Sequence, residues 1–324
     1  MNQIEFYRTW NLAFRNAKKK KRECLLENCD KTAIKSHALQ KSGILKQLSE
    51  KNHLFQFSNV TPFKKRRKGN FELSRIGIND VYTFPGFCKE HDSSVFKPIE
   101  TSEFDIKSDK SINLFSYRAL CQEIRRKEIA VDVADKLIAT KYNIALVAHM
   151  TDYKTGLLNG LENLYFFKRE LENDMEKSES SFIYKICEIP KTEICISAPI
   201  NIYDEKNPLT ETHDSNGNVT NNQFLTSFMN TFPHKDKSYV MTTLHKDFKC
   251  NWTENLFIQF ESSKNSEHLK LISDLISTRF EFWCISPRLK NDLAQEKIKL
   301  LFEIWSNEVL NFDSVIETDF NIFE

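Results

Sequence analysis

Four residues near the start of the sequence limit what the chain can fold into more than any others do. Cys24 and Cys29 form a C-x4-C pair. After a long insert, Cys88 and His91 form a C-x2-H pair. Thiolates and imidazoles are the ligands that hold Zn²⁺ in closed tetrahedral structural sites. The first pair can turn back on itself as a knuckle, and Gly86 can turn the chain so that a helix begins at the second pair. The spacing therefore predicts a structural zinc site in an N-terminal treble-clef module.

The alternative is that these cysteines are unrelated thiols. The chain has eight cysteines, and the five outside the two pairs are isolated in apolar or helical runs, as buried free thiols usually are. The sequence shows neither a secretory signal nor an apolar run of membrane-spanning length. We therefore expect a cytoplasmic protein without disulfides and without a membrane partner. The five isolated residues are Cys121, Cys187, Cys195, Cys250 and Cys284.

Charge is divided unevenly along the chain. Residues 1–90 hold 19 Lys and Arg against 8 Asp and Glu, a net charge of +11, whereas the remainder carries −10. Two clusters of cations lie within or beside the zinc module, and such clusters attract phosphate whatever the base sequence. They predict contacts with nucleic acid, the alternative being solvated loops, and the acidic remainder is expected to fold away from nucleic acid or to bind a protein partner. A further charged stretch, Arg118 to Lys127, is expected to be a solvated helix face, with Arg125 and Arg126 as alternative phosphate contacts. The predicted nucleic-acid contacts are Lys18, Lys19, Lys20, Lys21 and Arg22 in one cluster and Lys64, Lys65, Arg66, Arg67 and Lys68 in the other.

The apolar pattern divides the chain into three predicted domains and predicts an α+β fold. Residues 1–107 form the zinc module, in which the helix that begins near Cys88 must stop near Pro98. Residues 108–179 repeat apolar residues at three- and four-residue steps, which predicts a central helical hairpin. Residues 180–324 are rich in β-formers that alternate, which predicts a mainly antiparallel sheet with helices. The predicted helices cover 3–17, 42–51, 108–148, 159–175, 268–275 and 288–310, and the predicted strands cover 53–58, 182–189, 193–202, 238–244, 255–260 and 280–285.

The order of these residues resembles the zinc-stapled branch of the HNH (ββα-metal) nucleases. The resemblance implies that His37 is the general base in hydrolysis of a phosphodiester and that Asp92 holds a catalytic divalent cation, Mg²⁺ or Mn²⁺. It also implies that the zinc ion only holds the fold and, by analogy, that the protein belongs to a bacterial defence or mobile-element locus. It covers roughly residues 20–100 and rests, in chain order, on Cys24-x4-Cys29, Ser36-His37 and Cys88-x2-His91-Asp92.

Two functions of different classes follow from these patterns. One is a zinc-containing endonuclease that binds nucleic acid, with a C-terminal part that regulates it or chooses its substrate. The other is a non-catalytic zinc finger that binds nucleic acid or a protein partner. In that second case His37 is a rival to His91 as a zinc ligand, or a side chain that caps the helix over 42–51.

Overall fold

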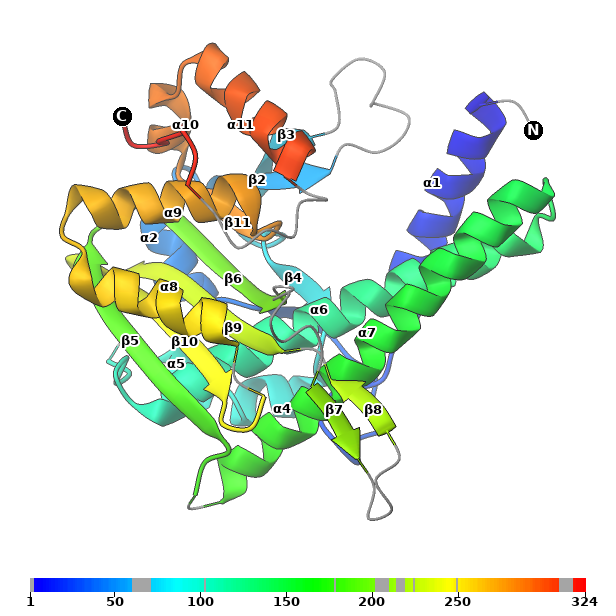
Figure 1. The fold of residues 1–324 in the computed structure, drawn as a ribbon, viewed down its shortest axis with the longest axis horizontal. Helices are drawn as coiled ribbons and strands as arrows, with labels where there is room; N and C mark the ends of the chain where they lie inside the picture. Colours follow the sequence, from blue (N-terminus) through cyan, green and yellow to red (C-terminus); the bar gives the residue numbers. More distant parts are fainter. Residues whose placement is uncertain are drawn as a thin grey trace.

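A seven-stranded antiparallel sheet forms the centre of the molecule (Figure 1). The strands follow the order β3-β2-β11-β6-β9-β10-β5, and every neighbouring pair is antiparallel. Their bounds are β3 Phe71–Gly77, β2 His53–Asn59, β11 Trp283–Ile285, β6 Ile194–Asn201, β9 Thr226–His234, β10 Lys237–His245 and β5 Phe182–Pro190. The expected α+β class with an antiparallel sheet is confirmed. The computed structural model describes residues 3–59, 71–101, 103–177, 179–201, 210–213, 219–223, 225–248, 250–308 and 317–324.

The sheet joins strands from distant parts of the sequence. The hairpin of β2 and β3 comes from the N-terminal part, and the short strand β11 connects it to the remaining strands. Cys284 in β11 lies opposite Gln56 in β2 on one side and opposite Cys195 in β6 on the other. The sheet therefore runs across the first and the third predicted domains, and the division into three domains stays a prediction.

Helices cover both faces of this sheet. On one face lie α6 (Asp109–Ala139) and α7 (Ile144–Glu176), and on the other lie α8 (Asn251–Ser262), α9 (Ser266–Thr278) and α11 (Gln295–Glu308). Because successive strand residues point to opposite faces, Val240 and Met241 of β10 enter different hydrophobic cores. Met241 belongs to the core beneath α6 and α7, which also contains the N-terminal cysteines. Val240 belongs to the core beneath α8, α9 and α11.

The first helix, α1 (Gln3–Lys19), packs beside the far ends of α6 and α7. Figure 1 shows these three helices extending away from the sheet towards the right of the view. A small separate core of Ala13, Ala17, Val133 and Leu137 holds α1 against α6. Within the described residues, no helix is both long enough and apolar enough to cross a membrane.

Short elements surround the N-terminal cysteines. β1 (Lys35–His37) and β4 (Thr83–Pro85) form a separate antiparallel pair, in which His37 lies opposite Thr83. The chain between them makes a π-helical turn, η1 (Lys41–Leu45), and then α2 (Lys46–Leu48) before it enters β2. The remaining short elements are α4 Lys89–Ser94, α5 Lys97–Glu100, β7 Thr210–His213, β8 Val219–Gln223 and α10 Pro287–Asp292.

Two strand predictions differ from the structure. The strand predicted over 255–260 is wrong, because these residues lie inside α8, where Leu256, Phe257 and Phe260 are buried at helical spacing. Ile258 is 50% exposed, as expected for the outer side of a helix. β9 lies outside the predicted strands. All of its residues are buried, so its sequence shows no alternation between apolar and polar residues.

Several helix boundaries also differ. The helix predicted over 108–148 ends at Ala139, and α7 begins at Ile144 after Asn143, whose side chain accepts a hydrogen bond from the N–H of Leu146 at 2.7 Å. The helix that begins beside Cys88 ends at Ser94, and Pro98 lies in the first turn of the next helix, where its missing N–H costs nothing. The predicted helical hairpin is nevertheless present, since α6 and α7 are consecutive and packed together.

Candidate metal centre

The first ligand pair lies in a tight turn that hydrogen bonds close at its base. Glu23 and Thr32 form an antiparallel bridge on either side of the pair. Asn28 has a φ of 58°, in the left-handed region that asparagine tolerates, so the chain turns back just before Cys29. This turn brings the sulfur atoms of Cys24 and Cys29 to the same place.

The second ligand pair lies where α4 begins. Cys88 is the residue before the first helical turn, and His91 follows within that turn. Gly86 ties this segment to the first pair, because its carbonyl oxygen accepts a hydrogen bond of 2.9 Å from the N–H of Leu25. A Cβ atom on Gly86 would lie 2.5 Å from the ring of Phe84, so close packing demands glycine here.

The four side chains converge on one point. Their ligand atoms all lie within 4.8 Å of one another. Sγ of Cys24 is 3.5 Å from Nδ1 of His91, and Sγ of Cys29 is 4.0 Å from Sγ of Cys88. With Zn–S near 2.3 Å and Zn–N near 2.0 Å, a tetrahedral site has edges of about 3.6 Å between sulfur and nitrogen and about 3.8 Å between two sulfurs. The predicted ligands therefore form one cluster that can hold a metal ion such as zinc.

The thiols of this cluster differ in how easily they ionise. Burial raises the pKa of Cys24 to about 11, although the N–H groups of Cys88 and Leu26 donate hydrogen bonds to its sulfur. Burial also opposes ionisation of Cys88, but hydrogen bonds from the backbone N–H groups of His91 and Glu90 and from the neighbouring thiols outweigh it and lower its pKa. Backbone donors aimed at sulfur suit a metal site, because the ligands must be thiolates when the ion is bound.

Arg125 on α6 fastens the metal cluster to the rest of the protein. Its Nε donates to the carbonyl oxygen of Pro85 at 2.7 Å, and a terminal nitrogen donates to that of Glu23 at 2.7 Å. The other terminal nitrogen pairs with Glu128 at 2.5 Å. Glu23 directly precedes Cys24, and Pro85 leads into the second ligand pair, so one side chain holds both halves. The expectation of a solvated residue or a phosphate contact is wrong for Arg125, whose side chain is 5% exposed.

Two other arginines of α6 also lie against the protein. The guanidinium of Arg118 lies 4.0 Å from the centre of the Phe96 ring, and its side chain is buried. Arg126 lies 3.7 Å from the centre of the Phe282 ring and pairs with Glu123 at 2.7 Å. The charged stretch predicted as a solvated helix face therefore packs against Phe96 and Phe282 through these two arginines.

His37 lies at the end of β1, outside the metal cluster. Its Nε2 is 3.1 Å from the carbonyl oxygen of Ile78. Burial lowers the pKa of His37, the hydrogen bond to Ile78 opposes this, and the positive charges of Lys41 and Arg118 lower it further. His37 is therefore not a rival to His91 as a ligand of this cluster.

Asp92 follows His91 on α4. Its Oδ1 is buried and has no hydrogen-bond partner among the residues that the structure describes. Across the same described ranges, the only group of three or more His, Cys, Asp or Glu side chains placed to hold a metal is the four-residue cluster. The catalytic roles of His37 and Asp92 stay predictions.

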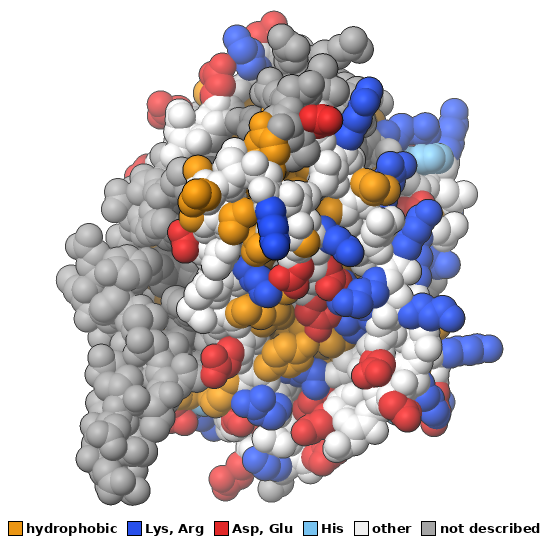
Figure 2. Space-filling model, turned by 90° about the vertical axis from the view of Figure 1, so that its right-hand side faces the viewer, with side chains coloured by type: hydrophobic (Ala, Val, Ile, Leu, Met, Phe, Trp, Pro, Cys, Tyr) orange, Lys and Arg blue, Asp and Glu red, His pale blue; other side chains and the backbone are white. Residues whose placement is uncertain are grey.

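The N-terminal basic cluster is partly engaged with α6. Arg22 contacts Glu128 at 3.2 Å and Asp132 at 2.6 Å, and Lys20 contacts Asp132 at 2.8 Å. Figure 2 views the molecule from the side towards which α1, α6 and α7 extend, and Lys and Arg side chains gather along the right-hand part of this face. Lys18, Lys19 and Lys21 are exposed. The second basic cluster, Lys64, Lys65, Arg66, Arg67 and Lys68, lies outside the described residues.

Comparison with known proteins gives no relative for this arrangement. No protein-family model matches the chain. No curated protein and no solved structure matches it either. The predicted cytoplasmic location and the predicted defence or mobile-element context therefore stay predictions.

Proposed function

We propose that this chain is a zinc-containing, nucleic-acid-binding protein whose N-terminal part hydrolyses phosphodiesters in the manner of HNH nucleases. The observation that carries the proposal is the set of elements around the metal cluster. Two antiparallel strands, β1 and β4, lead into the helix α4, and His37 ends the first strand. The turn that holds Cys24 and Cys29 adds two ligands beside this helix, which supports a treble-clef arrangement. Four protein ligands occupy every coordination position of a tetrahedral zinc ion and leave none open for water or substrate, so zinc here would be structural.

His37 is suited to the role of general base. A carbonyl oxygen only accepts hydrogen bonds, so the contact with Ile78 assigns the ring proton to Nε2 and leaves the lone pair on Nδ1. The lowered pKa of His37 keeps the imidazole neutral at pH 7. A neutral Nδ1 can take a proton from the attacking water while the hydrogen bond to Ile78 holds the ring in place.

Asp92 offers the ligand type that a catalytic divalent cation needs. Its buried Oδ1 lacks a hydrogen-bond partner in the described part of the chain, and Mg²⁺ and Mn²⁺ both prefer carboxylate oxygens. Such an ion, when bound, supplies charge stabilisation for the leaving oxygen. Because Asp92 directly follows His91, the zinc cluster would also fix the position of this carboxylate.

The position of two hollows near β1, β4 and α4 favours a second function, which is binding without catalysis. One hollow is lined by Lys41, Lys46 and their neighbours, and another by residues around Lys31 and Lys89. His37 and Asp92 line neither of these two hollows. A partner that reached the protein only through them would not touch the proposed base.

One experiment separates the two functions. Purified protein is incubated with plasmid DNA and with RNA, in the presence of Mg²⁺, Mn²⁺ or EDTA, and compared with His37→Ala protein of equal zinc content. Cleavage that needs the added metal and is lost in His37→Ala supports the nuclease. Binding without cleavage under every metal condition supports the non-catalytic module. The absence of binding to both nucleic acids at low salt rejects the nuclease and leaves only a protein partner for the non-catalytic module.

A further inference from the structure

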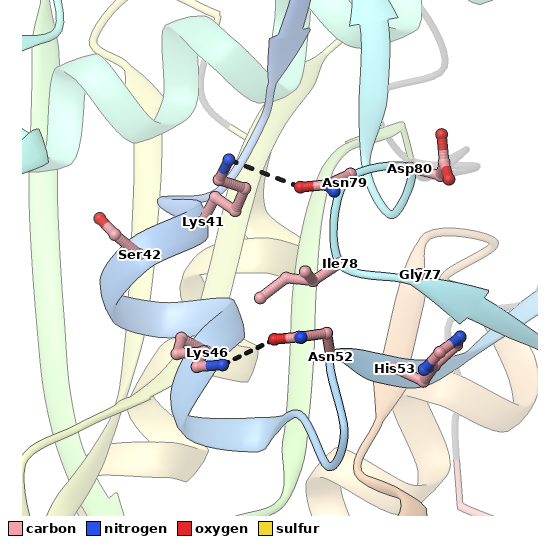
Figure 3. Close-up of a pocket in the computed structure, with 9 residues that line it drawn as sticks. All are labelled: Lys41, Ser42, Lys46, Asn52, His53, Gly77, Ile78, Asn79 and Asp80. Carbon is pink, nitrogen blue, oxygen red and sulfur yellow. Dashed lines mark hydrogen bonds between the residues drawn. The ribbon is translucent and has the colours of Figure 1, made fainter.

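A hollow of about 520 Å³ opens between the helical turn η1–α2 and the adjoining ends of β2 and β3 (Figure 3). Two lysines reach into it from the helical side, and two asparagines face them from the strand side. We infer that this hollow binds a phosphate group through the ammonium groups of Lys41 and Lys46, which both line it. The phosphate belongs to a nucleic-acid backbone or to a free nucleotide, which present the same chemistry.

Both lysines bond to neutral partners. Nζ of Lys41 lies 3.5 Å from Oδ1 of Asn79, and Nζ of Lys46 lies 2.6 Å from Oδ1 of Asn52. An amide oxygen accepts a hydrogen bond without cancelling the positive charge. Among the described residues, no carboxylate forms an ion pair with Lys41 or Lys46, so the hollow keeps two positive charges for an anion.

The acidic residue on the wall does not cancel this charge. Asp80 also lines the hollow, but its carboxylate is already paired with Lys35 of β1. Lys31, near the metal cluster, is likewise paired with Glu90. The two lysines of the hollow therefore differ from these neighbouring lysines, whose charge is balanced within the protein.

The arrangement of polar and apolar groups suits a phosphate ester. In Figure 3 the side chain of Ile78 lies between the Lys41–Asn79 pair and the Lys46–Asn52 pair. The ammonium groups donate to phosphate oxygens, and each asparagine can also donate after its amide rotates. Ile78 then offers an apolar surface to the sugar or base attached to the phosphate.

Both walls are held in place before any ligand arrives. On the helical side, Nε2 of Gln40 donates to the carbonyl oxygen of Glu100 at 2.7 Å, and a Cβ atom on Gly43 would lie 2.0 Å from Oε1 of Gln40. On the strand side, the N–H of Ile78 donates to the carbonyl oxygen of Asn52 at 2.9 Å. A site whose walls are already fixed loses less conformational entropy when it binds.

Ile78 links the hollow to His37. Its side chain lines the hollow, and its carbonyl oxygen is the hydrogen-bond acceptor of Nε2 of His37. A strand with one phosphate in the hollow would contact the residue that holds the ring of His37. This inference therefore deepens the proposed function, and it rests on that function only where the phosphate belongs to nucleic acid.

The test compares binding by four proteins of equal zinc content and melting temperature. They are the wild type, Lys41→Gln/Lys46→Gln, the charge-conserving Lys41→Arg/Lys46→Arg, and the control Lys107→Gln/Lys237→Gln. The control removes the same charge beside Glu188, at the opposite edge of the sheet. The probes are a labelled single-stranded oligonucleotide, its duplex, adenosine monophosphate and inorganic phosphate, each titrated at several salt concentrations.

We expect Lys41→Gln/Lys46→Gln to weaken binding of every probe that the wild type binds through the hollow by about tenfold or more at low salt. For the oligonucleotides, the slope of log affinity against log salt should fall by about 0.7 to 0.9, because one phosphate is no longer neutralised and its counterions are no longer released. The control should bind as the wild type does, and Lys41→Arg/Lys46→Arg should recover most of the affinity.

The outcomes separate the inference from the proposed function. Binding of the oligonucleotides, adenosine monophosphate and phosphate that is equal in wild type and Lys41→Gln/Lys46→Gln overturns the inference and leaves the proposed function standing. Lysine-dependent binding of adenosine monophosphate or phosphate, without binding of DNA or RNA, supports the hollow and overturns the proposed function. Binding of none of the probes by the wild type overturns both.

Discussion

Nε of Arg125 lies 2.7 Å from the carbonyl oxygen of Pro85, so the helix that covers the central sheet also holds the segment that carries Cys88 and His91. The same guanidinium holds the carbonyl oxygen of Glu23 beside the first ligand pair. The metal cluster and α6 are therefore parts of one packed structure. Disruption of either one should therefore destabilise the other.

Removal of this arginine should destabilise the whole protein. Arg125→Ala leaves the carbonyl oxygens of Pro85 and Glu23 without this donor and removes one of the partners of the Glu128 carboxylate, which should lower the free energy of unfolding by about 3 kcal/mol. Urea denaturation measures this change. The exposed Arg169 on α7 is the matched control, and Arg169→Ala should change stability by less than about 0.5 kcal/mol. Equal stability of the two variants would contradict the role assigned to Arg125.

The metal cluster should be needed for folding of the N-terminal part. Cys24→Ser and Cys88→Ser should each lose bound zinc and several kcal/mol of stability, because metal binding in such sites contributes directly to folding. Elemental analysis and thermal melting measure both effects. Cys187→Ser is the control, since that thiol lies outside the cluster and contacts carbonyl oxygens that a hydroxyl can also contact. Purified wild type without any bound metal would falsify the structural role.

Phosphodiester cleavage should depend on the neutral form of His37. His37→Ala should abolish metal-dependent cleavage and keep the zinc content, since His37 lies outside the cluster. Because burial lowers the pKa of His37, the wild type should stay active below pH 6.5, until the imidazole takes up a proton. Cleavage rates measured from about pH 8 down to about pH 5 test this dependence. His149 is exposed on α7, and His149→Ala should cleave as the wild type does.

A second histidine should make stability depend on pH. His245 is buried at the end of β10 beside the rings of Phe182 and Phe248, and burial lowers its pKa, although Glu170 at 3.7 Å opposes the shift. The imidazole of His245 therefore binds a proton more tightly in the unfolded chain than in the folded protein. Its contribution to the free energy of unfolding is present above the ordinary pKa of 6.5 and is lost as the pH falls below that value.

His245→Asn should therefore lose less stability than the wild type when the pH is lowered from about 7.5 to about 5.5. The asparagine oxygen can still accept the hydrogen bond that Nδ1 of His245 now receives from the N–H of Asp247. Urea midpoints at both pH values give the comparison. A fall in stability identical to that of the wild type would show that His245 does not carry the effect.

The N-terminal basic cluster should divide into binding and structural residues. Lys19→Gln/Lys21→Gln should weaken nucleic-acid binding and reduce its salt dependence without a change in stability, because both side chains are exposed. Arg22→Gln should instead lower stability, because Arg22 pairs with Glu128 and Asp132. Fluorescence anisotropy and urea denaturation on the same proteins separate the two effects. Unchanged binding by Lys19→Gln/Lys21→Gln would remove both lysines from the interface.

The ligand cluster could be predicted because its chemistry does not depend on the length of the insert. Two thiols at knuckle spacing and a C-x2-H at a helix start suit one metal ion, whatever lies between them. The role of Arg125 could also have been found. Leu114, Arg118, Cys121 and Arg125 follow one another at steps of four, three and four residues, so both arginines share one helix stripe with two apolar residues.

Other features leave no local signal in the sequence. β9 is buried along its whole length, so alternation cannot reveal it. The short strand β11 owes its place to pairing with Gln56 and Cys195, which are distant in sequence. The hollow between Lys41 and Lys46 depends on where Asn52 and Asn79 come to lie after the sheet has formed.

The pairing of Gln56 with Cys284 has a consequence for synthesis of the protein on the ribosome. β2 and β3 leave the exit tunnel early, but their partner strand is made only after most of the chain. At about 5–20 residues per second, this interval lasts on the order of tens of seconds. During it, the inner edge of β2 exposes unpaired backbone groups, which other chains can bind. Nascent chains should therefore depend on a chaperone to shield that edge until β11 emerges and pairs with it.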